Sequence, residues 1–276
     1  MTSISTSGSR KGANPRARIR LITRGDDAGS CRSANLAIRQ AFDQGFLRNA
    51  SVMAVGTAVE HAAEVLRDLP GLGLGLHVAL NCEWEHPRWG PVLPPKQVPS
   101  LVDNQGHLTR TPTVLHERKA PLEQMLAEVR AQYERLRALK LNVQYLDQHM
   151  GVGWVSGLGP ALEDFAQRQG LLYAEGLYPD LPLSGERRPE AAEDLVVRLR
   201  AAAPGTYLVI GHPCFDDEET RAFQWAGHPP GAMARDRDRQ RHMFLEDSVG
   251  QAFRQAQAEP CCYVDCHPDG QHPGGR

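Results

Sequence analysis

Residues 19–45 read IRLITRGDDAGSCRSANLAIRQAFDQG, and this stretch decides the fold. The run IRLIT at 19–23 is rich in β-branched and aliphatic residues, which is typical of a buried strand. After a turn with two aspartates, Ser33 is a candidate cap for a helix that continues to Gln44 and ends at Gly45. A strand followed directly by a helix is the repeating unit of parallel α/β folds.

The same alternation continues along the rest of the chain. The expected strands are 19–23, 50–55, 72–78, 142–147, 171–176, 206–211 and 261–265. The expected helices are 33–44, 58–68, 121–139, 159–169, 189–202 and 236–257. This pattern predicts an α/β fold, a TIM-like (β/α) barrel of about seven strands, and a doubly wound open sheet is the alternative. In both folds ligands bind at the carboxyl ends of the strands.

The 276 residues are expected to form one folded domain with two tails. Residues 1–17 are rich in Ser, Gly and Arg without periodicity and predict a disordered tail, and 268–276 predict a flexible one. The domain between them, 18–267, is interrupted at 81–120 by a segment with many prolines and two tryptophans. Loops of this length are usually functional or disordered. We therefore expect a lid-like insertion, with a packed surface excursion as the alternative.

Composition and charge argue against several classes of protein. The net charge of -2, with both signs interspersed, does not favour nucleic acid as the main ligand. The chain has no apolar run of the roughly 18 residues that a bilayer requires. Its first residues also lack the apolar stretch of a signal peptide. A cytoplasmic protein without a membrane partner is the expectation.

Cysteine is the remaining residue type with a bearing on compartment. The six cysteines are Cys31, Cys82, Cys214, Cys261, Cys262 and Cys266. Thiols of a large cytosolic protein usually stay reduced, so free cysteines are expected. A structural zinc site made by Cys261, Cys262, Cys266 and His267 is the alternative, although adjacent cysteines lack the usual two-residue gap.

Acidic and histidine residues collect at the ends of the expected strands. In chain order they are Asp26, Asp27, His77, Asp147, His149 and His212. Because the strand ends of a barrel converge on one face, residues far apart in the sequence are predicted to meet there.

A divalent metal accounts for the two adjacent aspartates. Neighbouring carboxylates repel unless a cation or a shared proton compensates. With Asp27 as a ligand, Asp26 beside it is a candidate base for water. His77 and His149 complete a set of two imidazoles and one carboxylate, which leaves open positions as a catalytic metal requires. Alternatively, the aspartates cap a helix and bond a turn, and each histidine is a structural residue.

Two further strand-end residues have candidate supporting roles. Asp147 lies two positions before His149 and can orient an imidazole from behind the metal ligands. His212, in the motif GHPC, is a candidate general acid because histidine exchanges protons near neutral pH. The alternative for His212 is a hydrogen-bonded turn residue ahead of Pro213.

Six motifs together resemble one known family. They are LITRGDDAG (21–29), NASVM (49–53), GLGLHVALN (73–81), SLVDNQGHL (100–108), YLDQHMG (145–151) and GHP (211–213). In their order and spacing they resemble the YdjC-like carbohydrate deacetylases, also called the ChbG/HpnK family, over nearly all of residues 19–265. That family is similar in its logic to the NodB-type polysaccharide deacetylases. The resemblance implies a barrel, one divalent cation and hydrolysis of an acetamido group on a carbohydrate.

The resemblance also implies roles for individual residues. It places the base at Asp26, the metal ligands at Asp27, His77 and His149, and the acid at His212. It implies magnesium as the cation. Two imidazoles and a carboxylate suit zinc, iron, cobalt or nickel, and zinc is the alternative that this ligand chemistry favours.

The chain departs from the family pattern at the fourth strand. Better-known members have Asp-Ser-His-x-His there, whereas this chain has Gln148 in place of the serine and Gly151 in place of the second histidine. The ligand histidine is kept, so metal binding is expected to persist while contacts near the substrate differ.

The expected partner is a small carbohydrate, and a homodimer is an open option. Trp84, Trp89 and Trp154 are candidates for stacking on sugar rings, with packing in the core as the alternative. Arg237 and Arg241 are candidates for steering carboxylates or the acetyl oxygen, with surface ion pairs as the alternative.

Two other functions stay open on the sequence alone. One is a metal-dependent hydrolase of another amide or ester bond. Among these, a phosphoester substrate is disfavoured, because phosphate chemistry usually recruits a basic cluster or two metals. The other is a non-catalytic sugar-binding protein on the same fold, which has no need of a free carboxylate at Asp26.

Overall fold

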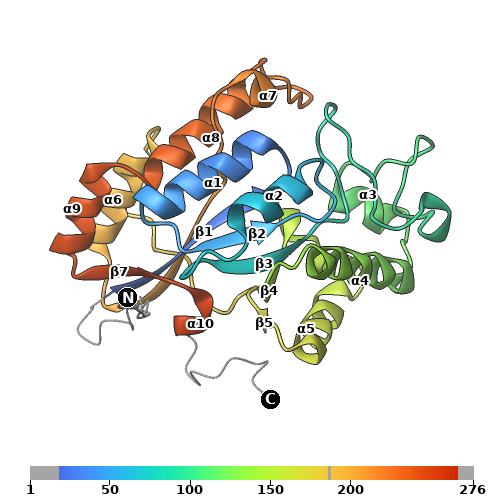
Figure 1. Ribbon diagram of the computed structural model, residues 1–276, viewed down its shortest axis with the longest axis horizontal. Helices are drawn as coiled ribbons and strands as arrows, with labels where there is room; N and C mark the ends of the chain where they lie inside the picture. Colours follow the sequence, from blue (N-terminus) through green and yellow to red (C-terminus); the bar gives the residue numbers. More distant parts are fainter. Residues whose placement is uncertain (1–18, 186–187, 267–276) are drawn as a thin grey trace, which may run out of the picture.

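The computed structural model describes residues 19–185 and 188–266, and its centre is a curled sheet of seven parallel strands (Figure 1). The strands are β1 (Ile19–Ala28), β2 (Asn49–Val52), β3 (Gly73–Val78), β4 (Val143–Gln148), β5 (Leu172–Tyr173), β6 (Gly205–Gly211) and β7 (Ala258–Cys261). Their order is β5-β4-β3-β2-β1-β6, and β7 pairs with β1. The predicted seven-stranded α/β fold is confirmed.

Strand β1 is the centre of this arrangement. It pairs with β6 along Ile19–Gly25, with β7 along Ile19–Ile22, and with β2 from Arg24 onward. The side chain of Asn49 joins β7 to the start of β2, because its amide donates to the carbonyl oxygens of Thr23 and Cys261. The sheet thus places the second half of β1 between β2 and β6.

The sheet curls toward a barrel but is not closed by direct pairing of its outer strands. Among the described residues, β5 and β6 make no ladder with each other. Instead, the chain beyond β5 returns to β6, where the backbone N–H of Leu208 donates to the oxygen of Pro179 (2.8 Å) and that of Leu181 donates to Leu208 (2.9 Å). The result is a partly closed barrel.

Helices cover the convex side of the sheet (Figure 1). The longer ones are α1 (Arg32–Gln44), α2 (Val59–Leu66), α4 (Leu122–Ala138), α5 (Leu158–Gln169), α6 (Ala191–Ala201), α8 (Ala232–Met243) and α9 (Asp247–Gln255). The short ones are η1 (Pro95–Gln97), α3 (Pro112–Glu117), η2 (His149–Trp154), α7 (Glu218–Arg221) and α10 (Tyr263–Cys266). No helix within the described ranges is long and apolar enough to cross a membrane.

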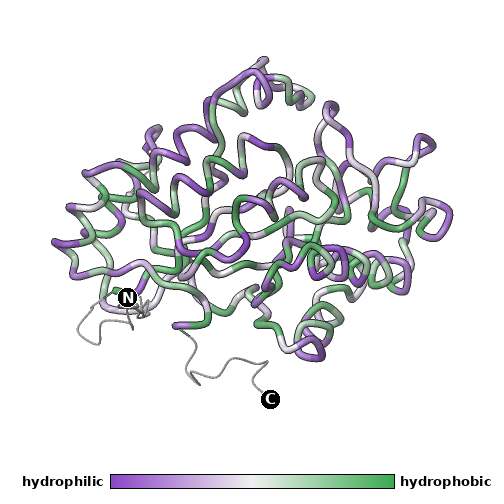
Figure 2. Tube along the Cα trace, in the orientation of Figure 1, coloured by the Kyte–Doolittle hydropathy of each residue, from purple (hydrophilic) through white to green (hydrophobic). Residues whose placement is uncertain are grey.

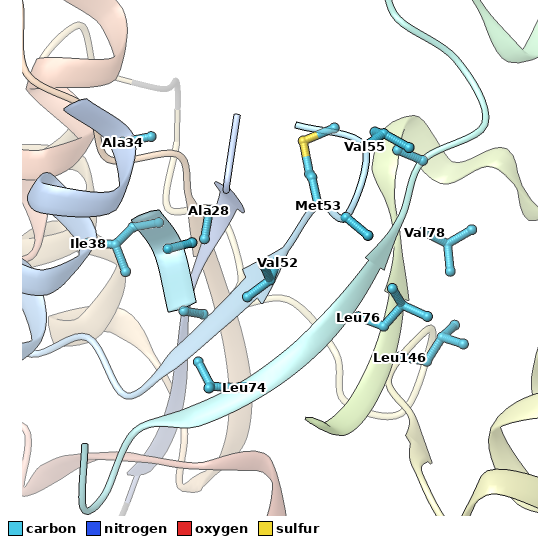
Figure 3. Packing of buried hydrophobic residues seen from close by; sticks show 14 of the residues in the cluster. Ala28, Ala34, Ile38, Val52, Met53, Val55, Leu74, Leu76, Val78 and Leu146 are labelled. Carbon is cyan, nitrogen blue, oxygen red and sulfur yellow. The ribbon is translucent and has the colours of Figure 1, made fainter. Parts of the chain in front are cut away.

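Two hydrophobic clusters lie on opposite faces of the sheet. Alternating side chains of a strand face opposite ways, so Leu21 joins the large cluster between sheet and helices while Ile22 joins a smaller one with Tyr145 and Tyr263. Figure 2 shows the apolar residues concentrated along the strands. Figure 3 shows Leu76 and Leu146 of neighbouring strands packed within the large cluster.

Several predicted boundaries are wrong for physical reasons. The single helix expected at 236–257 is two helices, α8 and α9. The chain leaves the helical path at Phe244, whose ring is fully buried and whose carbonyl accepts a hydrogen bond from Phe46 (2.9 Å). The strand expected at 261–265 ends at Cys261, and the backbone N–H of Tyr263 donates to the side chain of Asn49 rather than to the backbone of a neighbouring strand.

The predicted cap of α1 is also wrong. Cys31 caps this helix, and its sulfur accepts a hydrogen bond from the backbone of Ala34 (3.3 Å). The hydroxyl of Ser33 donates instead to Asp217. The serine lies two residues too late to reach the free N–H groups of the first turn.

The prediction that all six cysteines are free is wrong. Cys261 and Cys266 form a disulfide, because α10 turns back directly after β7. Cys31, Cys82, Cys214 and Cys262 are free and buried. The sulfur of Cys262 faces backbone carbonyl oxygens 3.2 Å away rather than the other thiols, which argues against the zinc alternative.

The parts of the chain that were expected to be tails, 1–17 and 268–276, lie outside the described residues, as does His267. The segment 81–120, expected to be a lid, has little regular structure beyond η1 and α3. It is anchored to α4 by the buried carboxylate of Glu128, which accepts hydrogen bonds from the backbone of Val92 (2.8 Å) and Leu93 (3.0 Å). Its closure over a site stays a prediction.

Candidate metal centre and active site

The carboxyl ends of β1, β3 and β4 bring three predicted residues together. Asp27, His77 and His149 are buried, and one ligand atom from each lies within 4.8 Å of the others. The Oδ1 atom of Asp27 is 3.5 Å from Nε2 of His77 and 3.4 Å from Nδ1 of His149. The two imidazole rings meet at 73°, so their nitrogens approach the carboxylate from different directions.

Irregular backbone at two strand ends produces this convergence. Asp27 has a φ of 65°, in the left-handed region that few residues other than glycine occupy, where the β1–β2 register shifts. After His149 the chain turns through Met150 and Gly151, with φ of 51° and 59°. Such conformations cluster at functional sites, because the surrounding structure must compensate their cost.

Each imidazole is oriented by a carboxylate on its far nitrogen. Asp147 contacts Nδ1 of His77 at 2.7 Å, and Glu83 contacts Nε2 of His149 at 2.9 Å. When a carboxylate accepts the N–H of one ring nitrogen, the other nitrogen keeps its lone pair. In the neutral form of each ring, that lone pair faces Asp27. The structure thus places Asp147 behind His77, and Glu83 is a supporting residue that the sequence analysis missed.

The charges of the centre are tightly coupled in the polypeptide alone. Burial opposes ionisation of Asp27, but the Arg237 guanidinium and the two histidines hold its pKa well below the usual range. Burial also opposes a charged His149, yet Glu83 and Asp27 raise the pKa of this imidazole to about 9. The pKa of His77 is likewise raised, against burial, by Asp147 and Asp26. Without a cation, the polypeptide therefore holds an ionised Asp27 between two positively charged imidazoles.

The three residues fit a divalent cation. The Oδ1 atom of Asp27 is buried without a hydrogen-bond partner, which is costly unless something else contacts it. Its other oxygen is held by Arg237 at 3.2 Å. One carboxylate oxygen and two imidazole nitrogens make a catalytic donor set with open positions.

Asp26 is held apart from this set by Arg24. The guanidinium contacts both oxygens of Asp26, at 2.7 and 2.9 Å, and also reaches Asp147 at 2.8 Å. Asp26, His77 and Asp147 form a second group with metal-ligand spacing. Because Arg24 already supplies a cation between its two carboxylates, the group with Asp27 is the better candidate for a metal.

A cavity of about 720 Å³ opens above these residues. Of the predicted site residues, those that line it are Asp26, Asp27, His77, Trp84, His149, His212 and Arg237. His212 is fixed by Gln240, whose side-chain oxygen accepts from the backbone N–H (2.7 Å) and lies 3.1 Å from Nδ1. The Nε2 atom of His212, on the other side of the ring, therefore remains available for proton transfer.

Two predicted tryptophans are not brought to the cavity. Trp89 is buried, and its indole N–H donates to the carbonyl of Asn81. Trp154 is 55% exposed and lies against the ring of His116. A tryptophan that was not predicted, Trp225, lines the cavity with 43% of its surface exposed.

Arg241, the other predicted arginine, pairs with Asp238 at 2.8 Å and lies over the ring of Phe215.

Three residues that line the cavity were missed by the sequence analysis. Of these, Arg24 had a usable signal, because it is a cation two positions before an aspartate on a strand. Glu83 and Trp225 lie in stretches without periodicity, so no sequence signal marked them.

The model of the YdjC-like protein family matches residues 20–178, which include the three candidate metal ligands and Glu83. The chain belongs to the YdjC-like family. Among curated relatives, it is 33% identical over 148 residues to a carbohydrate deacetylase of Geobacillus stearothermophilus, covering 53% of this chain and 56% of that protein. It is 28% identical over 230 residues to a chitooligosaccharide deacetylase of Enterobacter sp. strain 638, covering 75% and 86%.

The YdjC-like chain spans about half the length of the first two curated relatives that it matches, the second being a carbohydrate deacetylase of Brevibacillus brevis. Among solved structures, an Enterococcus faecalis V583 protein named for cellobiose-phosphate cleavage superposes with a TM-score of 0.74. The superposition covers 88% of this chain and 97% of that one at 18% identity, and it supports the fold.

Proposed function

We propose that this YdjC-like chain is a metal-dependent carbohydrate deacetylase. It hydrolyses the acetamido bond of an N-acetylated sugar and releases acetate and the free amine. The observation that carries the proposal is the convergence of Asp27, His77 and His149 around an unpartnered carboxylate oxygen, with Asp26 beside them in a large cavity. The names of the curated relatives support the substrate class.

The metal ligands are Asp27, His77 and His149. The chemistry that a divalent cation supplies when bound is Lewis acidity toward the acetyl carbonyl and toward water. Magnesium is the cation that the family resemblance implies, and zinc is the alternative that the two imidazoles favour. The Arg237 side chain holds the second oxygen of Asp27 and keeps the ligand oxygen turned toward the histidines.

Asp26 acts as the general base and takes a proton from the attacking water. Its carboxylate lines the cavity next to the ligand set, although it is not itself part of that set. His212 acts as the acid. Gln240 fixes its Nδ1 side, so Nε2 delivers the proton to the departing amine.

Arg237 and the aromatic residues hold the substrate. The Nη1 atom of Arg237 is buried without a partner at the cavity wall, where it can donate to the acetyl oxygen. Trp84 and Trp225 lie edge to face, 5.8 Å apart, and both line the cavity. They offer apolar surface to a sugar ring.

The test is acetate release from a panel of N-acetylated mono- and oligosaccharides. Activity should disappear with a chelator and return on addition of magnesium, zinc, cobalt or nickel, and the most effective ion identifies the cation. His212→Asn should lower kcat by about 10²-fold or more. The exposed His242→Asn is the matched control and should leave kcat unchanged. Full activity in the chelator, or no acetate from any substrate, would contradict the proposal.

A further inference from the structure

Arg24 is a buried cation at the centre of the candidate site. It is only 4% exposed, although its guanidinium lines the cavity. Arginine is rarely buried to this extent unless it is paired on several sides. Here Asp26, Asp147 and the hydroxyl of Tyr263 (3.1 Å) accept its hydrogen bonds.

The contacts of Arg24 join two carboxylates that have different tasks. Its Nε and Nη2 atoms hold the two oxygens of Asp26, while Nη1 reaches Oδ2 of Asp147. The other oxygen of Asp147 orients His77. A single planar guanidinium therefore sets the distance between Asp26 and the carboxylate that supports a ligand imidazole.

Strand geometry explains why this residue can do so. Arg24 and Asp26 lie two positions apart on β1, so both side chains face the same side of the sheet. Asp147 reaches the same point from β4, where it is registered beside His77 of β3. Lysine cannot replace this arrangement, because a single ammonium lacks the fork that binds one carboxylate on two atoms and still contacts another.

We propose that Arg24 is a positioning residue that holds the base Asp26 in line with the metal ligands. This inference rests on the proposed deacetylase function and assigns the group that fixes its base. Arg24 does not touch the substrate in this account, and its main effect on turnover passes through Asp26. Charge compensation of Asp147 is a second, separate contribution that supports folding.

A double-mutant cycle tests the proposal. The variants are Arg24→Ala, Asp26→Asn and the two combined. Arg39→Ala is the surface control, since Arg39 pairs with Asp43 and with the backbone carbonyl of Val65 and does not line the cavity. Arg24→Ala should lower kcat by roughly 10²-fold, the scale for a misplaced catalytic group, with little change in KM. In the Asp26→Asn background, removing Arg24 should change kcat by less than about threefold, because the group it positions is already gone.

Arg24→Lys guards against loss of the fold. It keeps the positive charge and should retain the native thermal midpoint within a few degrees, yet lose a substantial part of kcat. Equal, independent losses in both backgrounds would overturn the role of Arg24, as would full kcat in Arg24→Lys. If the wild-type chain releases no acetate, the proposed function fails and this inference fails with it. An active wild type with an additive cycle overturns the inference alone.

Discussion

The two histidines of the centre are supported by very different parts of the molecule. His77 and its partner Asp147 are registered side by side on the adjacent strands β3 and β4, and both are almost fully buried. His149 lies in η2, and its partner Glu83 comes from a segment without regular structure. One support is therefore determined by sheet register, whereas the other depends on the path of a long insertion.

This difference changes the meaning of residues 81–120. The sequence suggests a lid with aromatic residues for the substrate. The structure shows a segment anchored to α4 that brings Glu83 to His149 and Trp84 to the cavity. The insertion therefore contributes to the candidate metal centre itself, and we expect variation in it to alter the support of His149 and the cavity wall together.

The largest effect is expected where the two supports meet, at Asp27. Asp27→Ala removes the oxygen that both imidazoles face, so metal binding should be lost. The contribution of a Lewis acid is several kcal/mol, which corresponds to a fall in kcat/KM of roughly 10³-fold or more. Metal content and acetate release measured on one sample check this. The exposed Asp43→Ala should match the wild type, and a variant at Asp27 that still holds one ion would disprove the assignment.

Proton competition should affect the His149 side strongly. This imidazole is charged below its pKa of about 9 in the metal-free chain and must be neutral to bind a metal. The His149 proton alone should therefore make the affinity rise by about tenfold per pH unit between pH 7 and 9. Calorimetric titration in buffers of different ionisation enthalpy measures the released protons. Affinity that is constant over this range would contradict a raised pKa.

The metal-free chain should show the opposite dependence in its stability. The pKa of His149 is raised on folding, so its charged form stabilises the fold fully below about pH 6.5, the ordinary value, and less as the pH rises through 9. Thermal midpoints of chelator-treated protein should fall over this range. Saturating metal should flatten the dependence between about pH 6.5 and 9, because both imidazoles are then neutral in the folded chain and largely neutral in the unfolded chain.

The two supporting carboxylates should differ in a measurable way. Loss of such a partner typically reduces metal affinity or activity by about 10- to 100-fold. Asp147→Asn should lie at the upper end and also lower the thermal midpoint, because Asp147 additionally bonds Ser51 and Arg24. Glu83→Gln should lie at the lower end and, in the metal-loaded protein, where His149 is neutral, lower the midpoint less. Equal effects on stability would show that the insertion is as integral to the fold as the sheet.

The smallest effect is expected at the aromatic wall. Trp225→Ala should raise KM for an oligosaccharide by about fivefold, since stacking contributes on the order of 1 kcal/mol. Trp154→Ala is the matched control, because Trp154 is exposed outside the cavity. Equal KM values for both variants would remove Trp225 from the substrate site.

The same contrast explains what the sequence could predict. The convergence of Asp27 and His77 could be predicted, because the carboxyl ends of parallel strands meet on one face of the sheet, although the positive φ of Asp27 could not. The supporting residue Glu83 was harder to predict. Its place beside His149 depends on the path of the insertion 81–120, whose sequence has no periodic pattern. One predicted helix end was wrong for the same reason. The helical pattern is interrupted at Phe244, whose backbone carbonyl accepts a hydrogen bond from the backbone N–H of Phe46, 198 positions earlier. Local patterns carry no information on such long-range bonds.

A crystal structure of the cobalt- or zinc-loaded chain, with anomalous diffraction at the metal edge, tests the central claim most directly. Our account predicts one ion about 2.0–2.2 Å from Oδ1 of Asp27, Nε2 of His77 and Nδ1 of His149, with Asp26 still paired to Arg24. An ion bound instead among Asp26, His77 and Asp147, with the Arg24 guanidinium displaced, would contradict it.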